Sequence, residues 1–253
     1  LSVFKGVYKN WDDAPGDDYI FEAHVWINKI TENAKKTLSA YRSKENISSV
    51  SLIQDYILPV AGGMLLPSIK DNLCVLDFGG GMAASYFPLI SSIPNPEKVE
   101  FHIVEGKTIC EQGKNIFKDF PRLHFHEQLP KLNKKIHIVH AGSSIQYAPD
   151  WKGLLVDFIN YHPHLLVLED LMAGSIPSFV TTQNYYGKNL RTWFLNINEL
   201  IDEVETLGYH LIYKSRYTNK IISKTGRPLP MKNFSMKYRL KYGSHLMFER
   251  VKN

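Results

Sequence analysis

The stretch Leu73-Cys-Val-Leu-Asp77-Phe-Gly79-Gly80-Gly81 joins a short apolar run to an acid and three consecutive glycines. The apolar residues predict a strand of a parallel sheet that is covered on both faces. The glycines allow a sharp turn and let a ligand approach the backbone closely. A helix expected over 82–90 would aim its N-terminus at that ligand and favour a phosphate or a carboxylate. The spacing is neither Gly-x-Gly-x-x-Gly nor that of a P-loop, and a tight turn without a ligand is the alternative.

The composition indicates one α/β domain with an extension. The chain has 253 residues, 44% of them hydrophobic, and a formal net charge of +5. That charge is too balanced for a dedicated nucleic-acid binder. Cys74 and Cys110 stand apart from any Cys/His cluster, which predicts reduced thiols, a cytoplasmic protein and no zinc site. The sequence has no apolar run of membrane-spanning length and does not begin like a signal peptide.

The periodicity changes near residue 70. Residues 1–70 show no strand alternation and predict a helical N-terminal cap, whereas 71–253 alternate strands with helices as one compact unit. Strands are expected at 73–77, 99–105, 123–126, 136–142, 165–170, 209–213 and 245–249. Helices are expected at 17–40, 48–66, 82–90, 108–117, 151–160 and 199–207. This order predicts a Rossmann-like, doubly wound, mostly parallel α/β sheet of seven strands.

Glu105 gives the glycine turn a chemical meaning. It ends the second expected strand, 24 positions after Gly81, close to the offset at which an acid accepts hydrogen bonds from two ribose hydroxyls. This offset predicts an adenosyl ligand, which could be a nicotinamide dinucleotide or S-adenosylmethionine. A dinucleotide needs a second nucleotide-binding half, and the final strand pair fits the methyltransferase sheet better. The alternative is that Glu105 is a solvated acid at the end of a strand, without a ligand. If it binds the ribose, Glu105→Ala is expected to weaken cofactor binding while leaving the melting temperature nearly unchanged.

Several motifs in the same order resemble a family of S-adenosylmethionine-dependent methyltransferases of the class I superfamily. The resemblance spans about residues 4 to 213 and begins with a Phe-x-Gly-x-Tyr-x-x-Trp-x-x-Ala opening. The matching residues are Phe4, Gly6, Tyr8, Trp11, Ala14, 76–81 with Ser85-Tyr86-Phe87, Val104-Glu105, 141–147, 179–183 and 193–196. The family is often linked to synthesis of bacterial surface polysaccharides such as capsule. It therefore implies a transferase that uses S-adenosylmethionine, releases S-adenosylhomocysteine, and acts on an oxygen, or alternatively a nitrogen, of a glycan- or nucleotide-linked acceptor.

The resemblance also implies roles for individual residues around the cofactor. Asp77, Gly79, Gly80 and Gly81 would hold its methionine part, Glu105 its ribose and Glu127 its adenine edge. The segment that follows the fourth expected strand would lie beneath the sulfonium. Its residues there are Ser143, Ser144, Gln146 and Tyr147. The chain departs from the family at Glu169-Asp170, where relatives tend to carry a basic or mixed Asp-Arg pair.

Methyl transfer requires little of the protein beyond alignment, because the sulfonium methyl is already electrophilic. A hydroxyl acceptor gains from a general base, for which Asp170, His140 and His24 are the candidates. Asp170 comes first because it ends a strand, although a structural acid there is almost as reasonable. A buried, hydrogen-bonded role is the more usual one for a histidine such as His140. No metal is required, and the scattered acids and histidines show no ligand spacing.

Two later segments are candidates for acceptor binding. Residues 174–189 are longer than an ordinary loop and rich in amides and tyrosines, which predicts a pocket wall or lid with Gln183, Tyr185 and Tyr186. Residues 214–241, including Arg227, carry Lys and Arg without any acid. They would suit an anionic acceptor or peripheral contact with an anionic membrane surface, and a solvated excursion is the alternative. We expect no nucleic acid partner. A cofactor-binding module without catalysis and an NAD-dependent oxidoreductase or epimerase are the competing functions.

Overall fold

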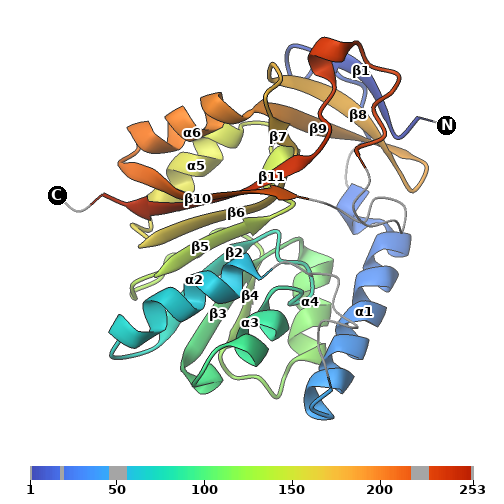
Figure 1. Cartoon of the computed structure of the whole chain (residues 1–253). Coiled ribbons are helices and arrows are strands. Elements are labelled where there is room, and N and C mark those ends of the chain that lie inside the picture. The colour runs from blue at the N-terminus through green and yellow to red at the C-terminus, as the bar shows by residue number, and fades with distance from the viewer. Residues whose placement is uncertain (1, 18–19, 46–55, 218–227, 252–253) are drawn as a thin grey trace. The chain divides into compact units, whose positions relative to one another are not determined.

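A computed structural model describes residues 2–17, 20–45, 56–217 and 228–251 (Figure 1). The chain forms two compact units. We call residues 21–141 and 161–167 the glycine-turn unit, and residues 1–20, 142–160 and 168–253 the hairpin unit. The segment expected as a cap, 1–70, is therefore shared between both units.

The larger sheet has seven strands, as the sequence predicted. Its order is β10-β11-β6-β5-β2-β3-β4. The strands are β2 (Leu73–Phe78), β3 (Val99–Val104), β4 (Leu123–His126), β5 (Ile138–Gly142), β6 (Leu165–Leu171), β10 (Tyr209–Tyr217) and β11 (Gly243–Arg250). Strand β2 pairs in parallel with β3 and β5, and β3 pairs in parallel with β4. Strands β10 and β11 are antiparallel. The sheet is mostly parallel, and the predicted α/β fold class is confirmed.

In its described residues, the glycine-turn unit has the α-helices α1 (His24–Arg42), α2 (Ile57–Leu65), α3 (Tyr86–Ser92) and α4 (Lys107–Ile116). Helix α1 buries Ile27, Ile30, Ala34 and Leu38, whose spacing places them on one face. That helix packs against α3 and α4 (Figure 1). Residues 48–55 of the second expected helix lie outside the described residues. Short 3₁₀ helices are η1 (Ile20–Glu22), η3 (Leu66–Ser68), η4 (Pro96–Lys98), η5 (Ile145–Tyr147) and η6 (Met236–Tyr238).

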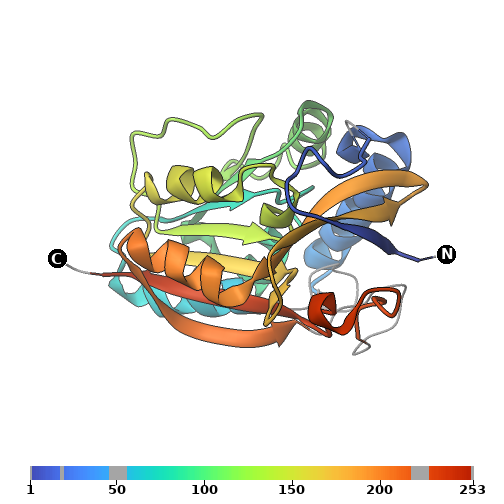
Figure 2. The same cartoon turned by 90° about the horizontal axis from the view of Figure 1, so that it is seen from above.

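A second, four-stranded sheet lies in the hairpin unit and corrects two expectations. Its order is β1-β8-β9-β7, with β1 (Phe4–Tyr8), β7 (Ala173–Gly174), β8 (Phe179–Tyr185) and β9 (Lys188–Asn196). The opening segment is thus a strand rather than part of a helical cap, and it lies along β8 (Figure 2). Residues 174–189 are not an irregular loop, because most of them build the β8–β9 hairpin, and their role as a pocket wall or lid stays a prediction. Tyr186 and Gly187 have φ values of 49° and 80°, which suit a two-residue hairpin turn.

The described part of the basic segment is packed rather than solvated. Leu229, Met231, Phe234 and Leu240 are buried in a core that also contains Phe4, Phe179 and Phe194. The guanidinium of Arg239 donates to the carbonyl oxygens of Phe234 and Lys232. The apolar residues interspersed among the lysines thus anchor this segment, so a freely solvated excursion does not describe it. Residues 218–227, which include Lys220, Lys224 and Arg227, lie outside the described residues.

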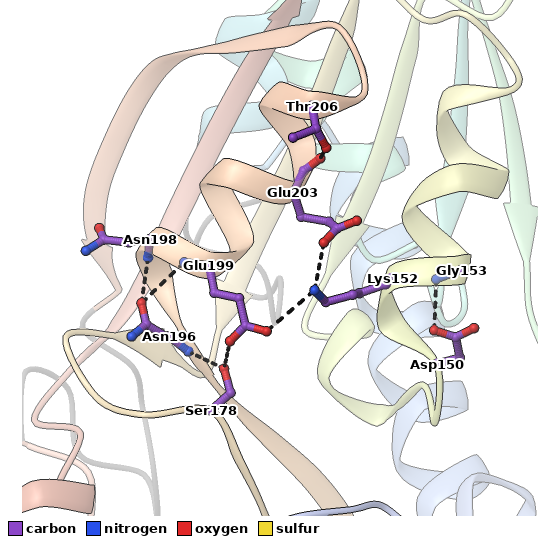
Figure 3. A network of polar contacts seen from close by, with 9 residues as sticks. All are labelled: Asp150, Lys152, Gly153, Ser178, Asn196, Asn198, Glu199, Glu203 and Thr206. Atoms are coloured by element: carbon purple, nitrogen blue, oxygen red, sulfur yellow. Dashed lines mark hydrogen bonds and ion pairs between the residues drawn. The ribbon is translucent and has the colours of Figure 1, made fainter.

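Helices α5 (Trp151–Ile159) and α6 (Ile197–Thr206) complete the hairpin unit. Figure 3 shows Lys152 of α5 reaching α6, where its Nζ lies 2.7 Å from Glu203 Oε2 and 3.6 Å from Glu199 Oε1. Asn196 caps α6, because its Oδ1 accepts hydrogen bonds from the backbone N–H groups of Asn198 and Glu199. This polar network fixes where α6 begins and how it lies against α5.

Asn196→Ala is expected to lower the free energy of unfolding by about 1 kcal/mol, since two N–H groups at the start of α6 lose their acceptor. Urea denaturation would measure the change. The exposed Asn198, two residues later, is the matched control, and Asn198→Ala should stay within about 0.5 kcal/mol of the parent protein. Equal losses in both variants would contradict the capping role.

Candidate functional site

The glycine turn follows β2 directly and bends back tightly. Gly79 and Gly81 have φ values of 70° and 56°, in the left-handed region that favours glycine. The N–H of Gly79 donates to the carbonyl oxygen of Val104 at 3.0 Å, which ties the turn to the end of β3. A Cβ on Gly80 would lie 2.3 Å from Asp77 Oδ2, whereas one on Gly81 would meet nothing within 4 Å. The turn is therefore closed on one side by Asp77 and open at Gly81.

Asp77 and His140 form a buried pair at adjacent strand ends. The two residues are partners in the β2–β5 register, and Asp77 Oδ1 lies 2.7 Å from His140 Nδ1. Their exposed fractions are 0% and 2%. Among the described residues, Asp77 Oδ2 has no hydrogen-bond partner. His140 is thus a packed, hydrogen-bonded residue that orients Asp77. This is the buried structural role that is more usual for such a histidine than the role of a general base.

Glu105 stands immediately after β3 and is held by two backbone groups. Its Oε1 accepts from the N–H of Gly81 and its Oε2 from the N–H of Gly106, each at 3.0 Å. Burial raises the pKa of Glu105 above its ordinary value, with a smaller rise from the charge of Asp77, and the two backbone donors oppose this rise. The carboxylate is fixed beside the open side of the glycine turn, and each oxygen accepts just one of these backbone bonds.

The two outlying candidates of the glycine-turn unit are solvent-exposed. Glu127 directly follows β4, at the same end of the parallel strands as Glu105. His24 is the first residue of α1 and is also exposed. The fold therefore places Glu127 at the carboxyl ends of the parallel strands, and no contact described for His24 distinguishes it as a base.

Four candidates follow β5 in the hairpin unit, around η5. Gln146 is fully buried, and its Nε2 donates to Ser143 Oγ at 3.3 Å and to the carbonyl oxygen of Asp170 at 3.1 Å. Ser143 has a φ of 53°. Within the described residues, Ser144 Oγ and Gln146 Oε1 are buried without a hydrogen-bond partner. Burial raises the pKa of Tyr147 to about 12, so this hydroxyl keeps its proton at neutral pH.

Asp170 is held in an unusual backbone conformation beside a histidine that sequence analysis missed. Its φ is 53°, which is costly for a residue with a Cβ and recurs at functional sites. The N–H of Asp170 donates to His245 Nδ1 at 3.2 Å, and its Oδ1 lies 3.7 Å from the same nitrogen. His245 comes from β11, 75 residues later in the chain, and no local motif marks it.

The expected acceptor residues are divided along the hairpin. Gln183 Oε1 accepts from Tyr147 Oη and from Thr192 Oγ1, both at 3.4 Å. Tyr185 and Tyr186 stand at the hairpin tip with ring centroids 4.8 Å apart. Arg227 lies outside the described residues. The fold thus connects Gln183 with Tyr147, while Tyr185 ends β8 and Tyr186 lies in the turn that follows.

The fold also groups acids and histidines that show no metal-ligand spacing in the sequence. Among the residues that the structure describes, two triplets bring one potential ligand atom from each residue within 4.8 Å of one another. They are Glu100, His102 and His124 in the glycine-turn unit, and Glu169, Asp170 and His245 in the hairpin unit. Because strand pairing creates both groups, spacing along the chain could not reveal them.

Within the described ranges, no helix has both the length and the apolar character that crossing a membrane demands. Helix α1, for example, has 19 residues, and charged side chains interrupt its apolar ones.

Comparison with known proteins gives similarity in structure alone. No protein-family model matches the sequence. No curated protein matches it either. Among solved structures, the [4+2]-cyclase SpnF aligns with a TM-score of 0.54 and 9% identity over 79% of this chain and 82% of SpnF. A complex of a Haloferax volcanii methyltransferase with its activator Trm112 aligns with a TM-score of 0.52 and 11% identity, covering 87% of this chain and 94% of that one.

A third structure is a Burkholderia thailandensis N1-methyltransferase with bound 1,6-didemethyltoxoflavin and S-adenosylhomocysteine, at a TM-score of 0.49, 10% identity and 94% coverage of both chains. At such identities, the similarity to the first two structures establishes the fold. The reaction has to be inferred from the residues of the site. The strand order and the first two alignments together give the chain a Rossmann-like α/β fold with a mostly parallel seven-stranded sheet.

Proposed function

We propose that this protein binds S-adenosylmethionine and transfers its methyl group to a polar acceptor, releasing S-adenosylhomocysteine. The fold alone does not decide this, since one structural neighbour is described as a [4+2]-cyclase. The observation that carries the proposal is the carboxylate of Glu105, held at the end of β3 by Gly81 and Gly106. A carboxylate oxygen has two lone pairs, so each can still accept a ribose hydroxyl.

The residues present fit an adenosyl cofactor. Beside Glu105, the backbone at Gly81 has open space on the side where a Cβ would stand. Asp77 has an oxygen without a hydrogen-bond partner among the described residues, and its pairing with His140 fixes it beside Gly80. Glu105 would hold the ribose, and Asp77 with the glycine turn would hold the methionine part. Glu127 remains our candidate for the adenine edge.

The cofactor supplies the electrophilic methyl, so the protein must orient it and align the acceptor. We assign orientation around the sulfonium to Ser143, Ser144, Gln146 and Tyr147. Tyr147 serves as a hydrogen-bond donor rather than a base, because burial raises its pKa to about 12. Asp170 is the proposed general base, supported by its strained φ of 53° and by His245 beside it. His140 would then act only through Asp77.

For the acceptor we propose an oxygen of a glycan- or nucleotide-linked molecule in surface-polysaccharide synthesis in the cytoplasm. Support comes from the motif resemblance and from Gln183, Tyr185 and Tyr186, which offer amide and hydroxyl groups. The basic residues of 214–241, among them Arg227, would favour an anionic acceptor or an anionic membrane surface. A nitrogen acceptor is the alternative within the same reaction.

Calorimetry with S-adenosylmethionine, S-adenosylhomocysteine and NAD tests the cofactor. Binding of both adenosyl sulfur compounds with dissociation constants in the micromolar range, and none of NAD, is the expected result. Binding of NAD alone would favour an oxidoreductase or epimerase. No binding of any of the three would favour a partner module without catalysis.

The acceptor is tested separately with cofactor carrying a labelled methyl group. Nucleotide sugars and extracted envelope glycans are incubated with the protein, and mass spectrometry locates the label. Incorporation into a carbohydrate hydroxyl is expected. Adenosyl binding without transfer to any of these substrates would keep the cofactor assignment and overturn the glycan assignment.

A further inference from the structure

Glu100, His102, His124 and His126 line one face of β3 and β4. Alternate residues of a strand point to the same face, and the register pairs His102 directly with His124. The ring centroids of His102 and His124 are 4.7 Å apart, and those of His102 and His126 are 5.2 Å apart. Two neighbouring strands thus place three imidazoles and a carboxylate together.

The distances suit a small metal ion. Glu100 Oε1 lies 3.5 Å from His102 Nε2 and 3.3 Å from His124 Nε2. In a tetrahedral zinc site, ligand bonds of about 2.0 to 2.2 Å put neighbouring ligand atoms about 3.4 Å apart. All three ligand atoms lie within 4.8 Å of one another. The distances from Glu100 to His102 and from Glu100 to His124 therefore already match a tetrahedral zinc site. The two imidazoles would have to move closer together for the third distance to match.

His102 provides an independent indication of a ligand. Its side chain is 3% exposed, and its Nε2 has no hydrogen-bond partner among the described residues. Its other nitrogen, Nδ1, lies 3.0 Å from His126 Nε2. Metal-bound histidines usually engage their second nitrogen in this way, which fixes the ring orientation.

Lys134 occupies the position of a cation in this cluster. Its Nζ contacts Glu100 Oε1, the same oxygen that faces both imidazoles. The side chains of Lys134 and His124 are 42% and 37% exposed. An incoming ion can therefore reach the cluster from the side of Lys134 and His124, and it would replace the Lys134 ammonium as the cation beside Glu100.

We propose that Glu100, His102 and His124 form a site for a divalent transition metal of the Zn²⁺ class, with His126 positioning His102 and a water completing the coordination. Two imidazoles and one carboxylate favour such an ion over Mg²⁺ or Ca²⁺, which prefer oxygen ligands. The ion fastens the short edge strand β4 to β3. Glu100 lies near the start of β3, about 16 Å along the strand from Glu105, so the three proposed ligands are separate from the proposed cofactor residues. Their outer partner His126 lies closer, because its carbonyl oxygen accepts from the N–H of Glu105.

Calorimetry with Zn²⁺ and Mg²⁺ on the metal-free, full-length protein tests the proposal, with Co²⁺ absorption as a report on geometry. One equivalent of Zn²⁺ should bind, Mg²⁺ should not, and Co²⁺ should give the intense visible bands of tetrahedral coordination. His124→Ala should weaken Zn²⁺ binding by more than roughly 100-fold and His126→Ala by about 10-fold, because the first removes a ligand and the second an outer partner. Lys134→Ala should tighten binding roughly 2- to 5-fold.

The second triplet supplies the matched control. Asp170→Asn should leave Zn²⁺ affinity unchanged, and Glu100→Gln should lower it in a protein whose circular dichroism matches that of the parent. Absence of Zn²⁺ binding to the parent protein would overturn the site. So would binding that survives His124→Ala and Glu100→Gln, or that disappears in Asp170→Asn. None of these results depends on whether S-adenosylmethionine binds.

Discussion

Glu105→Ala is expected to weaken S-adenosylmethionine binding by roughly 100-fold or more, because hydrogen bonds from both ribose hydroxyls to a charged acceptor disappear. Calorimetric titration of the variant and the parent measures the loss. Glu111, an exposed acid on α4, is the control, and Glu111→Ala should bind the cofactor as the parent does. An unchanged affinity in Glu105→Ala would remove the central support for an adenosyl site.

The same variant should also lose stability, which alters the expectation drawn from the sequence. Glu105 accepts from the N–H groups of Gly81 and Gly106, so its removal leaves one partly buried donor, at Gly81, and one exposed donor, at Gly106, without their acceptor. We expect a decrease of about 1 to 3 kcal/mol in the free energy of unfolding, rather than a nearly unchanged melting temperature. Calorimetric melting of the cofactor-free proteins would measure it.

The pH dependence separates the binding role of Glu105 from its structural role. Burial raises its pKa above the ordinary 4.5, and ribose hydroxyls bind better to the ionised form. Affinity for S-adenosylmethionine should therefore be full well above that raised pKa and fall as the pH drops through it. Glu105→Gln should show weaker binding without this dependence. The same pH profile in parent and Glu105→Gln would assign the titration to another group.

Gly80→Ala should destabilise the protein by about 1 to 3 kcal/mol and disrupt cofactor binding. The new Cβ would stand 2.3 Å from Asp77 Oδ2 and 2.7 Å from its Cγ. Asp77 cannot easily yield, because it is fully buried and paired with His140. Thermal melting and titration with S-adenosylmethionine would measure both effects.

Gly63 in α2 provides the matched glycine control. A Cβ there meets nothing within 4 Å, and alanine is the better helix former. Gly63→Ala should therefore raise the free energy of unfolding by about 0.5 to 1 kcal/mol and leave cofactor affinity unchanged. If Gly80→Ala changed the free energy of unfolding and the cofactor affinity as Gly63→Ala does, this would contradict the close packing of Asp77 against the turn.

The larger sheet and its ligand-binding end were predictable because their signals are local. Leu73, Val75 and Leu76 are apolar in a run too short for a helix, and the structure buries each of them in β2. Glycines mark the turn, since positive φ at Gly79 and Gly81 excludes most other residues. The offset from Gly81 to Glu105 follows from the length of one helix and one strand, and the two residues are hydrogen-bonded.

The second sheet escaped prediction because its partners are distant and its sequence is polar. Phe4 pairs with Gln183, and such pairing depends on contacts formed only in the folded chain. Thr181, Thr182 and Gln183 resembled a loop by composition, yet β-branched residues suit a strand once a neighbour supplies the hydrogen bonds. The strand in the opening of the expected helical cap and the hairpin in the expected loop were missed for this reason.

By itself, the sequence determined the chain order of the strands of the larger sheet and of most of the helices between them, the turn at Gly79–Gly81 and the acid that follows β3. Only the tertiary structure decided which side chains meet across strands. It paired Asp77 with His140, Asp170 with His245, and Glu100 with His102 and His124. Local periodicity specifies secondary structure, whereas burial and strand register bring together groups that are far apart in the chain, and these determine the chemistry.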